Sequence, residues 1–176
     1  MLSVWGCAMG GTISERLNNP VCIKGDPRDP WRGSDGLDER GHAKFVASRW
    51  CVRAWLKTLL EKERNRKVTL RRLIRDYAPA DDTVGSIPGA APNRPDYYAE
   101  AVGQWIGRDP DAEWDIFDDR TGAIHSEAVP LLVAIWRAIE RMESGGTVCT
   151  PMSELLAGAG EFYADYVEKR ARNGET

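Results

Sequence analysis

The sequence lacks an excess of charge of one sign, a long apolar run and a basic N-terminal start. Its 24 lysines and arginines against 27 aspartates and glutamates give a net charge of −3, so no global basic field favours nucleic acid as a partner. The longest apolar run, about residues 129–139, is far shorter than the roughly 20 residues of a membrane span. No basic n-region marks a signal peptide. We therefore expect no nucleic-acid partner, no membrane span and no evident secretion signal.

Cysteine and histidine are also sparse. The four cysteines are Cys7, Cys22, Cys51 and Cys149, with no C-x-x-C pair and no histidine pair nearby. Zinc sites need such spacing, so we expect no metal, and nothing indicates another cofactor. Reduced, mostly buried thiols are the first expectation, and one or two disulfides stay open for an oxidising compartment. The two histidines, His42 and His125, are isolated and are expected at the surface or at helix caps.

Apolar residues recur at helical spacing in five segments, about 45–64, 69–77, 96–106, 126–143 and 152–170. With 176 residues, 42% of them hydrophobic, the chain can bury one core. The spacing places Trp55, Trp105 and Trp136 on inward faces, and it places Thr69, Asp96 and Ser126 at helix starts. Glycine and proline predict loops over 25–43, with a short hairpin, and over 79–93.

The apolar segment over about 126–143 ends in Glu143-Ser144-Gly145. An apolar setting raises the pKa of a carboxyl group, which then keeps its proton near neutral pH. The helix dipole disfavours a negatively charged glutamate near a helix C-terminus, so a glutamate at this position favours a functional role. Glu143 is therefore a candidate general acid. Glu140 and Glu15 are alternatives, and a solvated helix end is the simpler interpretation.

Several segments, taken in order, resemble one family pattern. Residues 16–24 are similar to R-N-N-N-P-G-N-I, residues 29–33 to D-P-W-x-G, and residues 138–145 to I-x-x-H-E-x-G. This pattern is that of bacteriophage and prophage virion structural proteins of the lysozyme-like, peptidoglycan-degrading type, and the resemblance covers about residues 14–150. The chain departs from it at Val21-Cys22, where Gly-Asn is usual, and at Met142, where His is usual. These departures put retained catalysis in doubt.

A second resemblance concerns the order of the motifs. Bacterial glucosaminidases of the lysozyme superfamily carry a helix ending in E-S-G, then N-N-L-F-G-I-K-G, and later a tyrosine motif. Here Asn18-Asn19 leads a similar run, Tyr97-Tyr98 follows, and Glu143-Ser144-Gly145 comes last. We infer a circularly permuted lysozyme-like domain, because permutation is tolerated where chain ends lie together at a surface.

Together these resemblances imply a mainly α, lysozyme-like single domain of about five helices with long loops and a short β-hairpin. Its expected parts are an N-terminal extension (1–13), the lysozyme-like domain (14–150) and a C-terminal helix packed on it (151–176). Glu143 would be the general acid. The candidate substrate-binding residues are Asn18, Asn19, Trp31, Tyr97 and Tyr98. For the two asparagines, holding the loop through hydrogen bonds to the backbone is the favoured alternative, and one of the two tyrosines is expected in the core.

The implied activity is cleavage of peptidoglycan glycan strands, by hydrolysis or by lytic transglycosylation. The sequence selects no second carboxylate, and the transglycosylase route needs none. The protein would be made in the bacterial cytoplasm and act in the periplasm, in the cell wall or within a virion, in lysis or as a toxin. The alternatives are a non-catalytic virion protein and a module that binds other virion proteins or an immunity or inhibitor protein.

Overall fold

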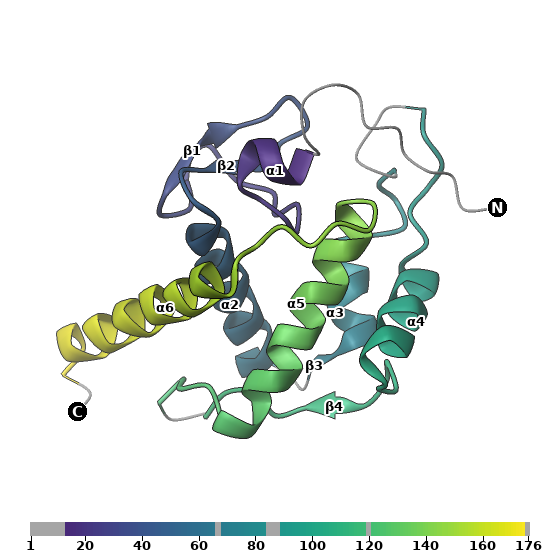
Figure 1. The fold of residues 1–176 in the computed structure, drawn as a ribbon. Coiled ribbons are helices and arrows are strands. Elements are labelled where there is room, and N and C mark those ends of the chain that lie inside the picture. The colour runs from purple at the N-terminus through teal and green to yellow at the C-terminus, as the bar shows by residue number, and fades with distance from the viewer. Residues whose placement is uncertain (1–12, 66–67, 84–88, 119–120, 175–176) are drawn as a thin grey trace. The chain divides into compact units, whose positions relative to one another are not determined.

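The computed structural model describes residues 13–65, 68–83, 89–118 and 121–174, and the fold is mainly helical (Figure 1). Its helices are α1 (Ile13–Leu17), α2 (Ser48–Asn65), α3 (Leu70–Tyr77), α4 (Pro95–Ile106), α5 (Val129–Glu143) and α6 (Met152–Arg172). The strands are β1 (Ser34–Leu37), β2 (Ala43–Phe45), β3 (Val68–Thr69) and β4 (Glu113–Trp114). The mainly α fold with a short hairpin is therefore confirmed. Cys7 lies outside the described residues.

The chain groups into two compact units. Unit 1 holds residues 1–60 and 139–176, and unit 2 holds residues 61–138. Unit 1 therefore joins the first third of the chain to its last segment, including the end of α5 and all of α6. This grouping places residues more than a hundred positions apart in one compact body.

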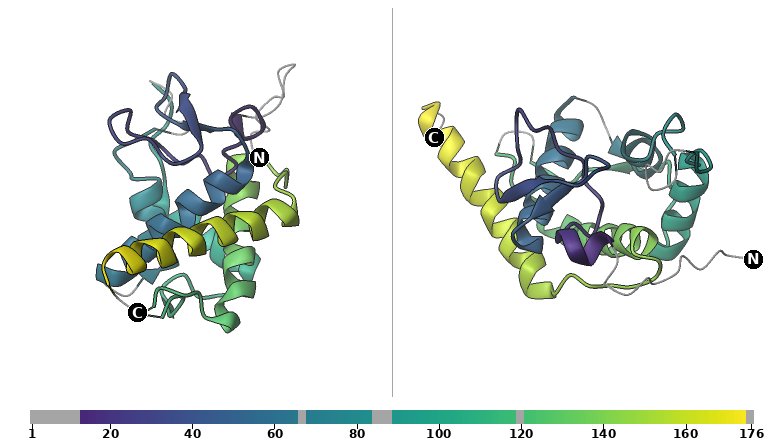
Figure 2. Two further views of the ribbon diagram at one scale, coloured as in Figure 1. Left: turned by 90° about the vertical axis from the view of Figure 1, so that its left-hand side faces the viewer. Right: turned by 90° about the horizontal axis from the view of Figure 1, so that it is seen from above.

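Unit 1 is built from a hairpin and helices. Strands β1 and β2 pair antiparallel, with Ser34 opposite Phe45. Helix α2 has no acidic residue of its own in its first turn, and a carboxylate from α6 takes that place: Glu154 accepts a hydrogen bond from the backbone N–H of Arg49 at 2.9 Å. Helix α6 runs beside α2 (Figure 2). A Cβ on Gly158 would lie 2.6 Å from the Arg49 carbonyl oxygen, so only glycine allows this approach.

Unit 2 is centred on the pairing of α3 with α4. The Thr69 side chain accepts from the N–H of Arg72 and caps α3, as the sequence predicts. Arg71 on α3 binds Asp111 at 2.8 Å and Glu100 at 2.6 Å. The short β3–β4 pair, Val68 with Trp114, was not expected from the sequence.

The predicted end of α4 is confirmed, whereas the predicted first residues of α4 and α5 are wrong. Gly107 ends α4 in the left-handed conformation, with φ of 66°. Helix α4 begins at Pro95, and Asp96 lies inside its first turn, bonded to Arg75, so Asp96 is not the cap. Ser126 opens a separate 3-10 turn, and α5 begins only at Val129.

Burial corrects two expectations about single residues. Trp55 and Trp136 are buried as expected, but Trp105 is 49% exposed. His42, expected at the surface or a cap, is buried, and its Nδ1 lies 3.0 Å from an Asp38 carboxylate oxygen. None of the described helices is long and apolar enough to cross a bilayer.

Candidate functional site

The C-terminal end of α5 has the form that the sequence predicts. Glu143 is the last helical residue, and the chain then turns through Gly145 and Gly146, with φ of 68° and 109°. The N–H of Ser144 donates to the Glu140 carbonyl at 2.9 Å, and its hydroxyl donates to the same carbonyl and to that of Thr147. This turn ends the helix directly after Glu143 and reverses the chain toward α6.

The two glutamates of this last turn have different surroundings. Glu140 has no exposed surface, whereas Glu143 is half-buried. The Oε1 atom of Glu140 accepts from the N–H groups of Cys149 (3.0 Å) and Thr150 (2.6 Å). It also accepts from the Thr150 hydroxyl at 2.6 Å and the Cys149 thiol at 3.3 Å. Glu140 thus ties the end of α5 to the segment that enters α6.

The Asn18-Asn19 turn lies in the same unit. Asn18 adopts φ of +48° and donates its amide to the Phe45 carbonyl at 2.8 Å. Asn19 has no exposed surface, and its amide nitrogen donates to Ile23 and Ala43 at 2.8 Å each. Its oxygen accepts the Ile23 N–H at 2.8 Å. Because every polar group of Asn19 is used within the protein, its role is to hold the turn rather than to touch a substrate.

Cys51 on α2 lies near both the asparagine turn and the buried glutamate. Its thiol donates to Asn19 Oδ1 at 3.2 Å. Burial raises the pKa of Cys51 well above its usual range; a backbone hydrogen bond at Val21 lowers it, and the neighbouring ionisable groups, Glu140 among them, raise it. Asn19 and Glu140 come from opposite ends of the chain, and both lie near Cys51: Asn19 accepts its hydrogen bond, and Glu140 is close enough to affect its pKa.

The thiols of this region are not poised for nucleophilic chemistry. Cys22, Cys51 and Cys149 are thiols outside any disulfide, as the first expectation held, but only Cys51 is buried, so the expected burial is wrong for the other two. Burial, followed by the hydrogen bond to Glu140, raises the pKa of Cys149 to about 12. A thiol in that state is protonated at neutral pH, and only the thiolate is a good nucleophile. The raised pKa therefore argues against Cys51 and Cys149 as nucleophiles, and the carboxyl groups stay the candidates.

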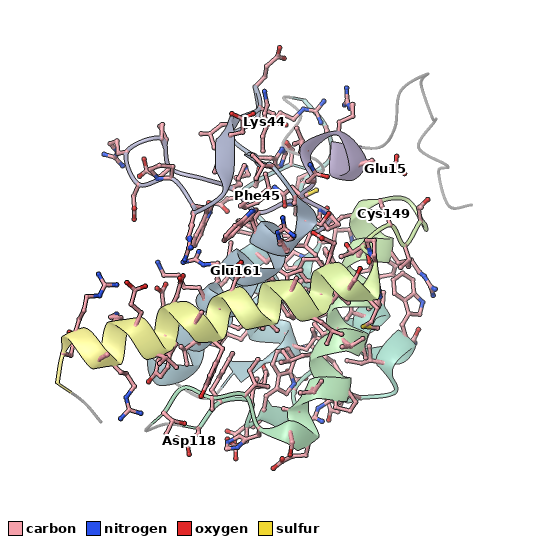
Figure 3. All side chains as sticks on the ribbon, turned by 60° about the vertical axis from the view of Figure 1, so that its left-hand side comes forward. Glu15, Lys44, Phe45, Asp118, Cys149 and Glu161 are labelled. Atoms are coloured by element: carbon pink, nitrogen blue, oxygen red, sulfur yellow. The ribbon has the colours of Figure 1, made fainter. Side chains whose placement is uncertain are left out.

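The other predicted residues of unit 1 lie at its surface. Glu15 is exposed on α1 and lies close enough to Cys149 to affect its titration (Figure 3). Trp31 is half-buried, its Nε1 donates to the Lys24 carbonyl at 3.0 Å, and the Lys57 ammonium lies 5.5 Å from its ring centroid. The indole is thus held in place by a hydrogen bond and a cation–π contact, and Lys57 covers one face of its ring.

The tyrosine pair belongs to unit 2. Tyr98 is buried in the core, and Tyr97 is 58% exposed with the Arg94 guanidinium 5.3 Å from its ring centroid. The expectation that one of the two is a core residue is confirmed. Tyr97 remains available as a substrate-binding residue.

Sequence reasoning missed Thr150 and Cys51 as parts of this region. Thr150 reaches Glu140 only because the turn after α5 brings it back ten positions later, and no periodic pattern marks that contact. Within the described stretches, no group of three His, Cys, Asp or Glu side chains is arranged to hold a metal ion. Comparison with protein-family models and with curated proteins found no match to this chain.

Proposed function

We propose that this chain cleaves the glycan strands of peptidoglycan and that Glu143 is its general acid. The observation that carries the proposal is the grouping of the Asn18-Asn19 turn with the end of α5 in unit 1. The resemblance to glucosaminidases requires these two motifs to meet, although they lie at opposite ends of the sequence. The hydrogen bond between Cys51 and Asn19, together with the electrostatic effect of Glu140 on Cys51, supports that pairing.

The backbone at Cys22 gives a second line of support. The resembled family carries asparagine at this position, and asparagine tolerates the left-handed conformation better than other side chains. Cys22 adopts φ of +51°. The turn thus keeps the backbone that asparagine suits, although the side chain has changed. This agreement favours a true correspondence between residues 16–24 and the family motif.

Accessibility favours Glu143 over Glu140 as the acid. A general acid must reach the glycosidic oxygen of a bound substrate at hydrogen-bond distance. Glu140 is fully buried, and its Oε1 serves four donors of its own chain, so Glu140 acts as a positioning residue. Glu143 keeps an exposed part on the last turn of α5. In this proposal, Glu143 protonates the leaving oxygen as the glycosidic bond breaks.

The partner is therefore peptidoglycan, and the setting is a phage particle, host lysis or a toxin delivered to the cell wall. The direct test incubates the purified protein with cell-wall sacculi and records the masses of the released fragments. We expect glycan fragments from the wild type and at least about a hundredfold less from Glu143→Gln. Products with 1,6-anhydro ends would identify transglycosylation, and reducing ends would identify hydrolysis. Intact sacculi after incubation with folded wild-type protein would overturn the proposal and favour a non-catalytic virion role.

A further inference from the structure

Helix α6 buries Leu155 and Phe162 against the rest of the protein, yet it also exposes a second set of large apolar side chains. Between Met152 and Val167 its charged residues are Glu154, Glu161 and Asp165. Each of them turns toward the rest of unit 1. Glu154 meets Arg49, Glu161 lies 4.0 Å from Arg32, and Asp165 binds both Arg32 and Arg53.

The opposite face of α6 presents large apolar side chains to solvent. Met152 is 49% exposed, Leu156 65%, Tyr163 54% and Val167 47%. At 3.6 residues per turn these four positions fall within an arc of about 60°. They form one continuous line, which we call the α6 stripe. Exposed large apolar residues occur singly on most proteins, but an uncharged line four turns long marks a contact surface.

The order of side chains along the stripe has a two-fold pattern. Two large residues, Met152 and Leu156, precede the small pair Ala159-Gly160, and two large residues, Tyr163 and Val167, follow it. A two-fold axis through the bond between Ala159 and Gly160 sets Met152 opposite Val167 of a second, antiparallel copy. The same axis sets Leu156 opposite Tyr163. Such self-complementarity is what a two-fold symmetric interface requires.

The centre of the stripe allows close approach. Open space surrounds the Cα of Gly160, since a Cβ built there would meet nothing within 4 Å. Small residues at a helix crossing let two backbones come near each other while the flanking large side chains interdigitate. No charge on the stripe opposes a second copy, because the three acids are held by arginines on the other face.

We propose that the α6 stripe binds a second copy of this chain, with the two α6 helices antiparallel. Each copy offers apolar area on the order of 400 Å², the size of the largest apolar patch on a typical monomer, which is often functional. This is less than the roughly 800 Å² per partner of a standard interface. The dimer is therefore weak and depends on concentration. A membrane surface fits less well, because lipid-binding helices carry Lys and Arg along their polar face, whereas α6 has acids there from Glu154 to Asp165 and basic residues only in its last turn.

Sedimentation equilibrium from low micromolar to near millimolar protein tests the dimer. We expect the wild type to dimerise over this range, and Leu156→Glu and Tyr163→Lys each to weaken the dimer at least tenfold. The matched control is Val46→Glu, which changes a residue of the same unit that is 63% exposed and lies off α6. It should dimerise like the wild type.

The double variant Leu156→Glu/Tyr163→Lys tests the register. In the antiparallel pair each new glutamate faces a new lysine, so dimerisation should recover, whereas Leu156→Glu/Tyr163→Glu should stay monomeric. A monomeric wild type at the highest concentration would overturn the proposal. Failure of the charge pair to restore the dimer would overturn the antiparallel register. Binding of monomeric wild type to anionic phospholipid vesicles would assign the stripe to membranes instead.

Discussion

The two compact units keep their polar groups in different places. The buried polar and charged residues of the described chain all belong to unit 1: Asn19, His42, Arg53, Glu140, Ser144 and Thr150. In unit 2 the ion pairs lie at the surface, where the acids that meet Arg71 are each more than half exposed. Burying polar groups is costly unless each is satisfied. Unit 1 meets that condition at the end of α5, where the buried Glu140 carboxylate is satisfied by Cys149 and Thr150, whereas the acids of the Arg71 ion pairs in unit 2 stay exposed to solvent.

The largest expected effect comes from removing the buried acceptor. Glu140→Ala leaves four donors without their acceptor, and each unsatisfied buried donor costs about 1–3 kcal/mol. We expect the free energy of unfolding to fall by about 3 kcal/mol or more in urea titrations. The control Glu143→Ala, at a half-buried helix end, should cost less than about 1 kcal/mol. Equal losses of unfolding free energy in the two variants would contradict the assignment of Glu140 as the structural glutamate.

The next effect concerns the close approach of α6 to α2 in unit 1. Gly158→Ala puts a Cβ 2.5 Å from Val52 Cβ and 2.6 Å from the Arg49 carbonyl oxygen. Overpacking of this kind costs about 1–3 kcal/mol. The matched control Gly160→Ala meets no atom within 4 Å and should stabilise the helix by about 0.5–1 kcal/mol. The melting temperature should therefore fall for Gly158→Ala and rise for Gly160→Ala. A change in the same direction for both variants would contradict the close packing of α6 against α2.

A smaller effect follows from the Asp38–His42 pair. Burial by itself raises the pKa of Asp38, but the hydrogen bonds from His42 and from the backbone N–H groups of His42 and Arg40 outweigh it and lower the pKa below its usual value. A lowered pKa in the folded state stabilises the fold above the ordinary carboxyl pKa of about 4. That stability is lost as pH falls through the folded-state pKa. Below about pH 4, the free energy of unfolding should therefore decline less steeply with falling pH in Asp38→Asn than in the wild type. The same decline in both proteins would show that Asp38 contributes no pH-dependent stability.

The smallest effect is expected in unit 2. Arg71→Ala breaks pairs with exposed Asp111, Glu100 and Asp96, and such surface pairs are worth about 1 kcal/mol or less. Its cost should shrink further as salt is added, because salt screens exposed charges. Urea titrations at low and high salt measure both quantities. A loss as large as that of Glu140→Ala would break the contrast between the units.

The sequence predicts the helices well because their signals are local. The Thr69 cap, the Gly107 stop and the helix end at Glu143 each depend on neighbouring residues, and each is confirmed. The burial of Glu140 is different. Glu140 and Glu143 lie three residues apart on nearly the same face of α5. Their surroundings differ because the turn at Gly145 and Gly146 brings Thr150 back to Glu140.

Other errors have the same origin in tertiary contacts. His42 is buried because the hairpin folds it against Asp38, although nothing beside it in the sequence requires burial. Trp105 occupies a helical position typical of a core residue, yet it is 49% exposed. Side-chain periodicity shows which residues share a face, and the neighbouring elements decide whether that face is covered.

The central claim is that Glu143 does the chemistry while Glu140 holds the turn. Its most direct test compares fragment release from sacculi by Glu143→Gln and Glu140→Gln, each expressed per folded molecule from circular dichroism. Glutamine at 140 keeps a carbonyl oxygen for the Cys149 and Thr150 N–H groups, so activity per folded molecule should stay within about tenfold of the wild type. Glu143→Gln should lose about a hundredfold or more. The reverse order of losses would contradict the account and make Glu140 the acid.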